Sequence, residues 1–297
     1  MQFYQPKELP KIMVAPNGVR PMKKDHPKVP ITIDEIVNTA KLSYEAGAEA
    51  IHFHIRDKNS QHILDANDCS EALIKLNKIV PNMHLQVTTE AVGRYSPSEM
   101  RKYAYDVKPP GISIAIRELI PSRNPTDEDV KLYKYLSDEN INVQHIWHEP
   151  EDIDLLSNVL NKSEIEKDNK WCLFVIGHYS GKISDPNKIP LYLEKLEKNK
   201  FKADWAICAF EKEEFICLKE AIKLGGKIRI GFENSLYLPS GEIAQDNETK
   251  IKVIKEELNL NWIIFYFWNF IRFYRTNYKS VWSNYKSLRF YIIKIFT

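Results

Sequence analysis

Eight short apolar runs, each followed by a longer stretch of helical period, constrain the fold of this chain more than any other feature. Such runs are typical of buried parallel strands, and the 3.6-residue period between them predicts helices. Eight strand and helix units over about 260 residues match a (β/α)8 barrel, or TIM barrel, in count and in length. The predicted strands are residues 12–15, 51–54, 84–87, 112–116, 143–147, 172–176, 205–208 and 228–231.

Two of the intervening segments carry clear helix starts. Thr32 and Glu35 form a capping box, and so do Ser96 and Glu99, where Pro97 also takes the first helical position. A doubly wound open sheet would use similar elements, but the turn after the first strand lacks the G-x-G-x-x-G pattern of that fold. The other predicted helices cover residues 68–79, 126–139, 153–160, 189–197, 213–224 and 247–258.

The composition limits both the class of protein and the kind of metal site. A formal net charge of +2 provides no basic field for nucleic acid. The N-terminal segment lacks the apolar core of a signal peptide, which favours a cytoplasmic protein without a membrane partner. The four cysteines are scattered without a C-x-x-C pair, which argues against a disulfide framework and against a zinc knuckle. Any metal is therefore expected to have nitrogen and oxygen ligands.

The second predicted strand carries His52 and His54. Because alternate side chains of a strand lie on the same face, the two imidazoles point in one direction and indicate a metal site. A half-buried strand that carries two histidines without a metal is the alternative. Catalytic zinc is commonly held by two histidines and one carboxylate, with a further position left open.

The third ligand should follow a neighbouring strand at the carboxyl end of the barrel, where active sites of this fold lie. Closure of the barrel places the eighth strand beside the first. Glu233 can therefore reach His52 and His54 across a single strand. The competing carboxylate donors are Glu90, Glu118 and Asp57.

Five motifs follow one another along the chain. They are Asn17-Gly18, the stretch GAEAIHFHIRD that contains both histidines, QVTTEAVGRYSP at 86–97, SIAIRELIP at 113–121 and RIGFENSLYLPSGEIAQDN at 229–247. Together they resemble the β-keto acid cleavage enzymes, whose prototype is the 3-keto-5-aminohexanoate cleavage enzyme of lysine fermentation. The similarity runs from about Lys11 to Glu257, and it implies the fold of that family, a (β/α)8 barrel.

The resemblance also implies a metal and a reaction. The metal is a divalent ion, normally zinc, held by His52, His54 and Glu233, which are the ligands that the barrel argument selects. In the reaction, a β-keto acid condenses with acetyl-CoA to give acetoacetate and a new acyl-CoA. Arg229 matches the active-site arginine of the family and is the first candidate catalytic residue. Family members are usually homo-oligomers, so a dimer or a tetramer is expected.

The remaining site residues include two departures from the prototype. Thr88 falls where the family has a small hydroxyl residue that contacts substrate, and Asn17 is a further candidate for substrate binding. Asn234, a candidate catalytic residue, stands where the prototype has an acidic group paired with the arginine, so Glu118 is the nearest alternative acid or base. Arg20 stands where the prototype binds its substrate's ammonium with a glutamate. We therefore expect a substrate that is neutral or anionic away from its keto-acid end.

The composition changes abruptly after about residue 260. Residues 261–297 hold 14 of the 34 aromatic residues and no Asp or Glu. The apolar run at 262–271 is about ten residues long, too short for a bilayer, which requires about 20. We predict a barrel domain over residues 1–260 and an anomalous tail over 261–297, either frameshifted, as out-of-frame translation of an AT-rich gene would give, or disordered. A basic aromatic tail that lies on a membrane surface is the alternative.

Two other functions stay open on the sequence alone. A metal-dependent aldolase or lyase would share the barrel and the zinc but would not need acetyl-CoA. An inactive product of a C-terminally frameshifted gene would instead be poorly soluble, because exposed aromatic side chains without acidic partners promote aggregation.

Overall fold

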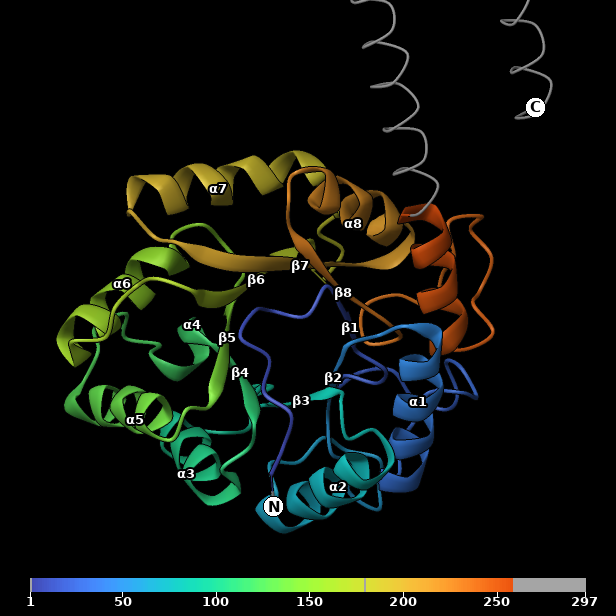
Figure 1. The fold of residues 1–297 in the computed structure, drawn as a ribbon, viewed down its shortest axis with the longest axis horizontal. Helices are drawn as coiled ribbons and strands as arrows, with labels where there is room; N and C mark the ends of the chain where they lie inside the picture. Colours follow the sequence, from blue (N-terminus) through green and yellow to red (C-terminus); the bar gives the residue numbers. More distant parts are fainter. Residues whose placement is uncertain (1, 179, 259–297) are drawn as a thin grey trace, which may run out of the picture. The chain divides into compact units, whose positions relative to one another are not determined.

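The computed structural model describes residues 2–178 and 180–258, and it contains a closed barrel of eight parallel strands (Figure 1). Each strand pairs with the next one along the chain, and the last pairs with the first. The predicted (β/α)8 barrel is therefore confirmed. The strands are β1 (Ile12–Val14), β2 (Ala50–Phe53), β3 (His84–Thr88), β4 (Gly111–Ala115), β5 (Asn142–Trp147), β6 (Lys170–Ile176), β7 (Ala203–Ala209) and β8 (Lys227–Ile230).

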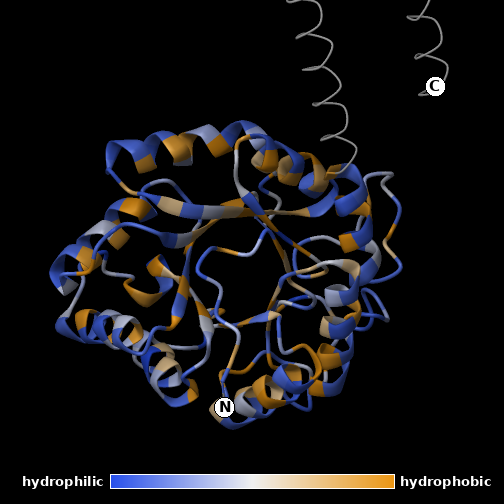
Figure 2. Ribbon diagram, viewed as in Figure 1, coloured by the Kyte–Doolittle hydropathy of each residue, from blue (hydrophilic) through white to orange (hydrophobic). Residues whose placement is uncertain are grey.

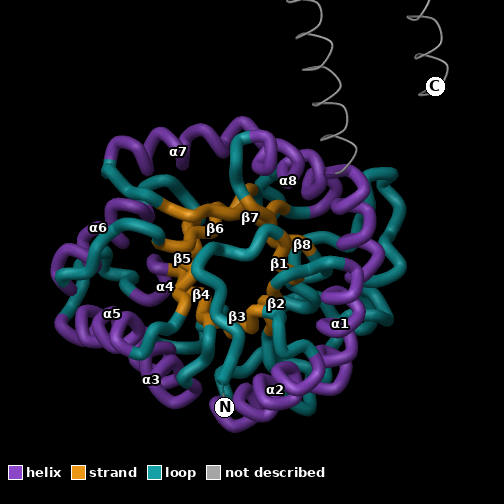
Figure 3. Tube along the Cα trace, in the orientation of Figure 1, coloured by secondary structure: helices purple, strands orange, loops and turns teal. Residues whose placement is uncertain are grey.

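Helices surround the barrel (Figure 3). Both predicted capping boxes are present, at Thr32 with Glu35 and at Ser96 with Glu99. The helices are α1 (Ile33–Ala46), α2 (Ala66–Ile79), α3 (Pro97–Val107), α4 (Ile116–Leu119), α5 (Asp127–Asp138), α6 (Asp152–Ser163), α7 (Ile189–Lys198) and α8 (Glu214–Lys223), with short 3-10 turns η1 (Pro186–Lys188) and η2 (Glu211–Glu213). Residues 247–258 are also helical. The short helix α4 was not predicted, because the fourth strand ends one residue earlier than its apolar run suggests.

The interior of the barrel is divided into a polar half and an apolar half. The polar side chains come from neighbouring positions on β2 to β5, where His52 pairs in register with Gln86, and Ser113 pairs with Gln144. The opposite half is an apolar cluster that includes Leu173, Val175, Ala206 and Cys208. Along the surrounding helices, polar and apolar residues alternate (Figure 2), as expected for helices that cover a barrel with one face. Arg229 of β8 and Glu233, which follows β8, reach these polar groups from the other side of β1.

The amino end of the barrel is closed by the segment that precedes β1. The backbone N–H of Leu9 donates to Asp204 Oδ2 at 2.7 Å, and Lys227 Nζ lies 2.7 Å from the same oxygen. Leu9 and Met13 join the apolar cluster of the interior. In Figure 1 this N-terminal segment crosses the centre of the barrel. The predicted site residues lie at the opposite end, at the carboxyl ends of the strands.

Residues 1–253 form one compact unit, and the second unit, 254–297, is described only over residues 254–258, which are helical. The predicted tail over residues 261–297, with its boundary at residue 260, lies outside the described residues. Within residues 2–178 and 180–258, no helix is long and apolar enough to cross a membrane.

Candidate active site

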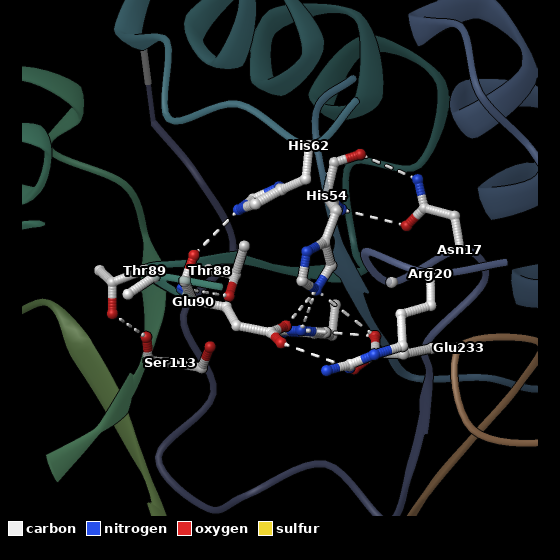
Figure 4. Close-up of polar contacts among 12 residues, drawn as sticks. Asn17, Arg20, His54, His62, Thr88, Thr89, Glu90, Ser113 and Glu233 are labelled. Atoms are coloured by element: carbon white, nitrogen blue, oxygen red, sulfur yellow. Dashed lines mark hydrogen bonds and ion pairs between the residues drawn. The ribbon is translucent and has the colours of Figure 1, made fainter. Parts of the chain in front are cut away.

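His52 and His54 come together at the carboxyl end of β2, on one side of the strand as predicted. His52 is part of the strand and His54 follows it closely (Figure 4 shows His54). Both side chains are buried, and their Nε2 atoms are 3.1 Å apart. Two ring nitrogens that face each other at this distance need a shared proton or a cation between them, because their lone pairs would otherwise repel.

Glu233 enters the same space from the segment that follows β8. Its Oε2 lies 3.6 Å from Nε2 of each histidine. Only β1 separates β8 from β2 in the barrel, as the closure argument predicted. Two glycines allow Glu233 to approach the histidines. Gly231 has φ +151°, and a Cβ there would collide with Ala15 O. A Cβ on Gly18 would collide with the Glu233 side chain itself. The ligand atoms of the two histidines and Glu233 all lie within 4.8 Å of one another.

Side-chain amides hold both histidines. Gln86 Oε1 lies 2.8 Å from His52 Nδ1, which favours the tautomer that keeps the proton on Nδ1 and leaves the Nε2 lone pair available to a cation. Asn17 Nδ2 donates to His54 O at 2.8 Å, and Asn17 Oδ1 accepts the His54 N–H at 3.1 Å. Asn17 is fully buried and also donates to Pro30 O. These contacts place the Asn17 amide behind His54, whose backbone it holds, and substrate binding by Asn17 stays a prediction.

The charges of the site are set by Arg229, which points into the barrel from β8. Its Nη2 lies 3.0 Å from Glu233 Oε1. Burial alone would raise the pKa of Glu233, but Arg229, His52 and His54 together outweigh it and hold this pKa well below its usual range. Burial, helped by the same charge, lowers the pKa of His52 well below its usual range. At neutral pH the carboxylate is therefore ionised and the imidazole is neutral, which is the state that metal binding requires.

This donor set fits a divalent cation. It offers imidazole nitrogens and a carboxylate oxygen in a buried position, which is a set that zinc commonly takes. The nearest thiol in the cavity wall belongs to Cys208, and burial raises its pKa to about 11. Cys208 is therefore protonated at neutral pH, and the available ligands are nitrogen and oxygen atoms, as the scattered cysteines suggested.

His52, Glu233 and Arg229 line a cavity, and so do three further predicted site residues: Thr88, Glu118 and Asn234. The Thr88 hydroxyl accepts the Glu90 N–H at 3.0 Å. Glu118 extends from α4, its Oε2 accepts the Ala91 N–H at 3.0 Å, and burial raises its pKa. The amide of Asn234 is buried and has no hydrogen-bond partner among the described residues, so both of its polar atoms are available to a ligand.

The mouth of the cavity is bordered by Arg20, Glu90 and Glu118, which we call the rim. Arg20 Nη1 lies 4.0 Å from Glu90 Oε1, and these side chains are 47% and 27% exposed. Glu90 Oε2 also lies 3.9 Å from His54 Nε2. Burial raises the pKa of Glu90, and the proximity of His54 opposes this rise. Glu90 thus remains the second nearest carboxylate to the histidines, behind Glu233.

The family model of the beta-keto acid cleavage enzymes matches residues 11–259 of this sequence. The chain belongs to that family. It is 26% identical over 252 residues to the 3-oxoadipate:acetyl-CoA acetyltransferase of Cupriavidus necator, covering 82% of this chain and 86% of that protein. It is 24% identical over 257 residues to the 3-keto-5-aminohexanoate cleavage enzyme of Acetoanaerobium sticklandii, covering 82% of this chain and 91% of that one. The resemblance found in the motifs is thus confirmed.

Solved structures agree on the fold of this family member. The binary complex of ObcA with oxaloacetate superposes with a TM-score of 0.65 at 14% identity, covering 79% of this chain and 64% of that one. This chain therefore spans less than two thirds of that structure. The type I 3-dehydroquinate dehydratase of Clostridium difficile superposes with a TM-score of 0.53 at 11% identity, covering 82% of this chain and 90% of that one. At these identities the likeness supports the barrel alone.

Three residues near the site were not among the predicted site residues. Gln86 could have been, because it lies two positions before Thr88 and shares its face of β3. The second residue, His148, lines the cavity, and burial lowers its pKa to about 4. The third residue, His62, packs edge-on against His54, with ring centroids 4.9 Å apart. The competing donor Asp57 instead caps a turn by accepting the N–H groups of Asn59 and Gln61.

Proposed function

We propose that this chain is a zinc-dependent enzyme that condenses a β-keto acid with acetyl-CoA and releases acetoacetate and a new acyl-CoA. Family membership and the names of two relatives, an acetyl-CoA acetyltransferase and a keto-acid cleavage enzyme, support the reaction class. The observation that carries the proposal is the buried set of His52, His54 and Glu233, whose ligand atoms lie within 4.8 Å of one another.

Zinc suits this set because two imidazoles and one carboxylate leave a coordination position open. When bound, it would polarise the keto group of the substrate and stabilise negative charge on the substrate oxygen. The chain contributes the arrangement of the ligands. Gln86 and Asn17 hold the two histidines, and Arg229 holds Oε1 of Glu233 so that Oε2 faces them.

We assign binding and proton transfer to different residues of the cavity. Arg229, Thr88 and Asn234 offer hydrogen bonds to substrate oxygens next to the metal ligands. An amide does not take up a proton at neutral pH, so Asn234 cannot act as a base. Glu118 is the proposed acid or base, because it lies on the same cavity wall and burial raises its pKa toward the range in which proton transfer is efficient.

The rim supports a proposal on the substrate class. Arg20 is the cationic side chain of the rim, and it faces the cavity mouth from the segment after β1. We propose that the substrate is neutral or anionic at the end away from its keto acid, since a cation there would be repelled by Arg20. Glu90, 4.0 Å from Arg20, reduces this preference without removing it.

One experiment tests the function. Zinc is measured by elemental analysis on the full chain and on His52→Ala, together with acetyl-CoA-dependent release of acetoacetate from a panel of β-keto acids. We expect about one zinc per chain, lost in the variant, and turnover of at least one acid. A folded wild-type sample without zinc would overturn the metal assignment. Turnover without acetyl-CoA would indicate an aldolase or lyase. Light scattering on the same sample tests the proposed dimer or tetramer.

A further inference from the structure

A buried ion pair lies behind the segment that carries Glu233. Lys250, in the helical stretch 247–258, pairs with Glu214, the first residue of α8, and both side chains are 0% exposed. Neither residue lines the cavity described above. A fully buried ammonium is rare, because removing its charge from water is costly unless every donor is satisfied.

The contacts of this pair converge on residues 231–237. An ammonium group has three N–H donors, and those of Lys250 meet Glu214 Oε2, Ser235 O at 2.6 Å and Tyr237 O at 3.2 Å. The other oxygen of Glu214 accepts the Gly231 N–H at 3.4 Å. The pair therefore binds the backbone two residues before Glu233 and two residues after it.

The segment needs such support because no strand continues through it. β8 ends at Ile230, and Gly231 then adopts a positive φ. Asn247 adds to the support, since its Oδ1 accepts the Phe232 N–H at 2.9 Å and its Nδ2 donates to Pro16 O at 3.2 Å. A shift of the backbone here would move the Glu233 carboxylate away from the histidines, and metal sites tolerate only about 0.5 Å of such displacement.

We propose that Lys250 and Glu214 are positioning residues that set the metal affinity of the site by holding Glu233 in place. This inference rests on the proposed metal site. Any buried ammonium needs partners for all three of its donors, and the choice of these partners is what points to a positioning role. Here two of the three ammonium donors, and one carboxylate oxygen, are used on the backbone that flanks Glu233.

The chain offers a matched control in a second ion pair with a buried member. Arg101 on α3 lies 2.7 Å from Asp129 on α5, with exposures of 18% and 2%. Neither residue lines the candidate active site. Arg101→Met should lower stability as Lys250→Met does, but it should leave residues 231–237 intact.

The test measures the zinc dissociation constant of the full chain by competition with a chromogenic chelator. It compares wild type, Lys250→Met, Glu214→Gln, the double variant and Arg101→Met, at a temperature where circular dichroism shows each sample folded. We expect zinc affinity to fall about 10–100-fold in each Lys250 and Glu214 variant and to change less than about twofold in Arg101→Met. The double variant removes both charges, so it should regain stability over Lys250→Met and still bind zinc weakly.

Three results would overturn the proposal. Wild-type affinity in Lys250→Met and in Glu214→Gln would show that the pair does not act on Glu233. An equal loss in Arg101→Met would show that affinity merely follows stability. Absence of zinc binding in the folded wild type would remove the proposed function together with this inference, whereas the first two results leave the proposed function standing. If Lys250→Met does not fold, Glu214→Gln, which keeps a neutral hydrogen-bonding partner for Lys250, decides alone.

Discussion

The metal-binding end of the cavity and its mouth are built in different ways. We call His52, His54, Glu233 and Arg229 the floor. These side chains are at most 5% exposed, and each ligand is held by a neighbour on the barrel or on the segments beside it. At the rim, Arg20 and Glu90 are 47% and 27% exposed, and their charged atoms are 4.0 Å apart. The difference suggests that the floor fixes the reaction and that the rim selects among substrates.

The largest effect should come from breaking the floor at Glu233. Glu233→Gln keeps the shape of the side chain but removes the charge that would bind a cation beside the two histidines. We expect zinc content to fall to background and kcat/KM to fall by at least about 10³-fold, since a metal supplies several kcal/mol of charge stabilisation. Elemental analysis and the acetoacetate assay measure the two losses.

Glu90→Gln is the matched control for this change. Glu90 also approaches His54, with Oε2 at 3.9 Å from Nε2, but it belongs to the rim. The control should keep its zinc and lose activity only modestly. If Glu90→Gln loses its zinc and Glu233→Gln keeps it, Glu90 is the metal ligand in place of Glu233, and the metal lies nearer the mouth of the cavity.

The next largest effect is expected at Glu118, because this rim residue is also the proposed acid or base. Burial raises its pKa, so it takes up a proton at a higher pH than an exposed glutamate, for which the pKa is about 4.3. If the ionised carboxylate is needed, kcat/KM falls as the pH drops through this raised pKa. Glu118→Gln should remove that acid limb and lower the plateau by about 10²-fold, a typical contribution of general acid or base catalysis.

The control for Glu118 is again on the rim. Glu90→Gln removes the other rim carboxyl whose pKa burial raises, and the acid limb should persist in it. A glutamine at position 118 can still accept the Ala91 N–H through its carbonyl oxygen, so the local backbone should not move. If the pH profiles of Glu118→Gln and wild type coincide, another group carries the proton.

A smaller effect is expected from Gln86, which hydrogen-bonds to His52 but is not itself one of the four floor residues. Gln86→Leu removes the hydrogen bond that fixes the His52 tautomer and should weaken zinc binding about 10–100-fold, the usual range for a group that orients a ligand. Gln144→Leu is the same change on β5, where the amide is buried and has no hydrogen-bond partner among the described residues. Equal zinc affinities in the two variants would contradict the role of Gln86.

The three proposed metal ligands of the floor could be predicted from the sequence because they follow from two regularities of the backbone, whereas Arg229 was predicted from the family resemblance. Alternation along β2 places His52 and His54 on one side, and closure of the barrel brings the segment after β8 to them. Asn17 shows where this reasoning ends. Its position at the end of a strand was predictable, but the direction of its amide depends on the fold of the segments around it.

Lys250 could not be recognised for a related reason. A single lysine in an amphipathic helix is normally solvent-exposed, and its burial here depends on Glu214, which lies 36 positions away in the sequence. Contacts of this kind are fixed by tertiary packing and leave no periodic signal. The same holds for His62, which reaches the side of His54 only because the segment after β2 folds back.

The smallest effect, and the one that most directly sharpens the comparison, should come from Arg20. Arg20→Glu reverses a charge at the exposed rim and leaves the floor untouched, so zinc content should not change. An exposed charge contact is worth about 1 kcal/mol, so the relative kcat/KM for β-keto acids with anionic and cationic ends should shift by about tenfold or less toward the cationic ones. Lys23→Glu makes the same charge change in the same segment, at a side chain that pairs with Glu35 outside the cavity, and it should leave the preference unchanged. If Arg20→Glu changes zinc content, or leaves the substrate preference as it was, selection does not lie at the rim and the division between the two regions fails.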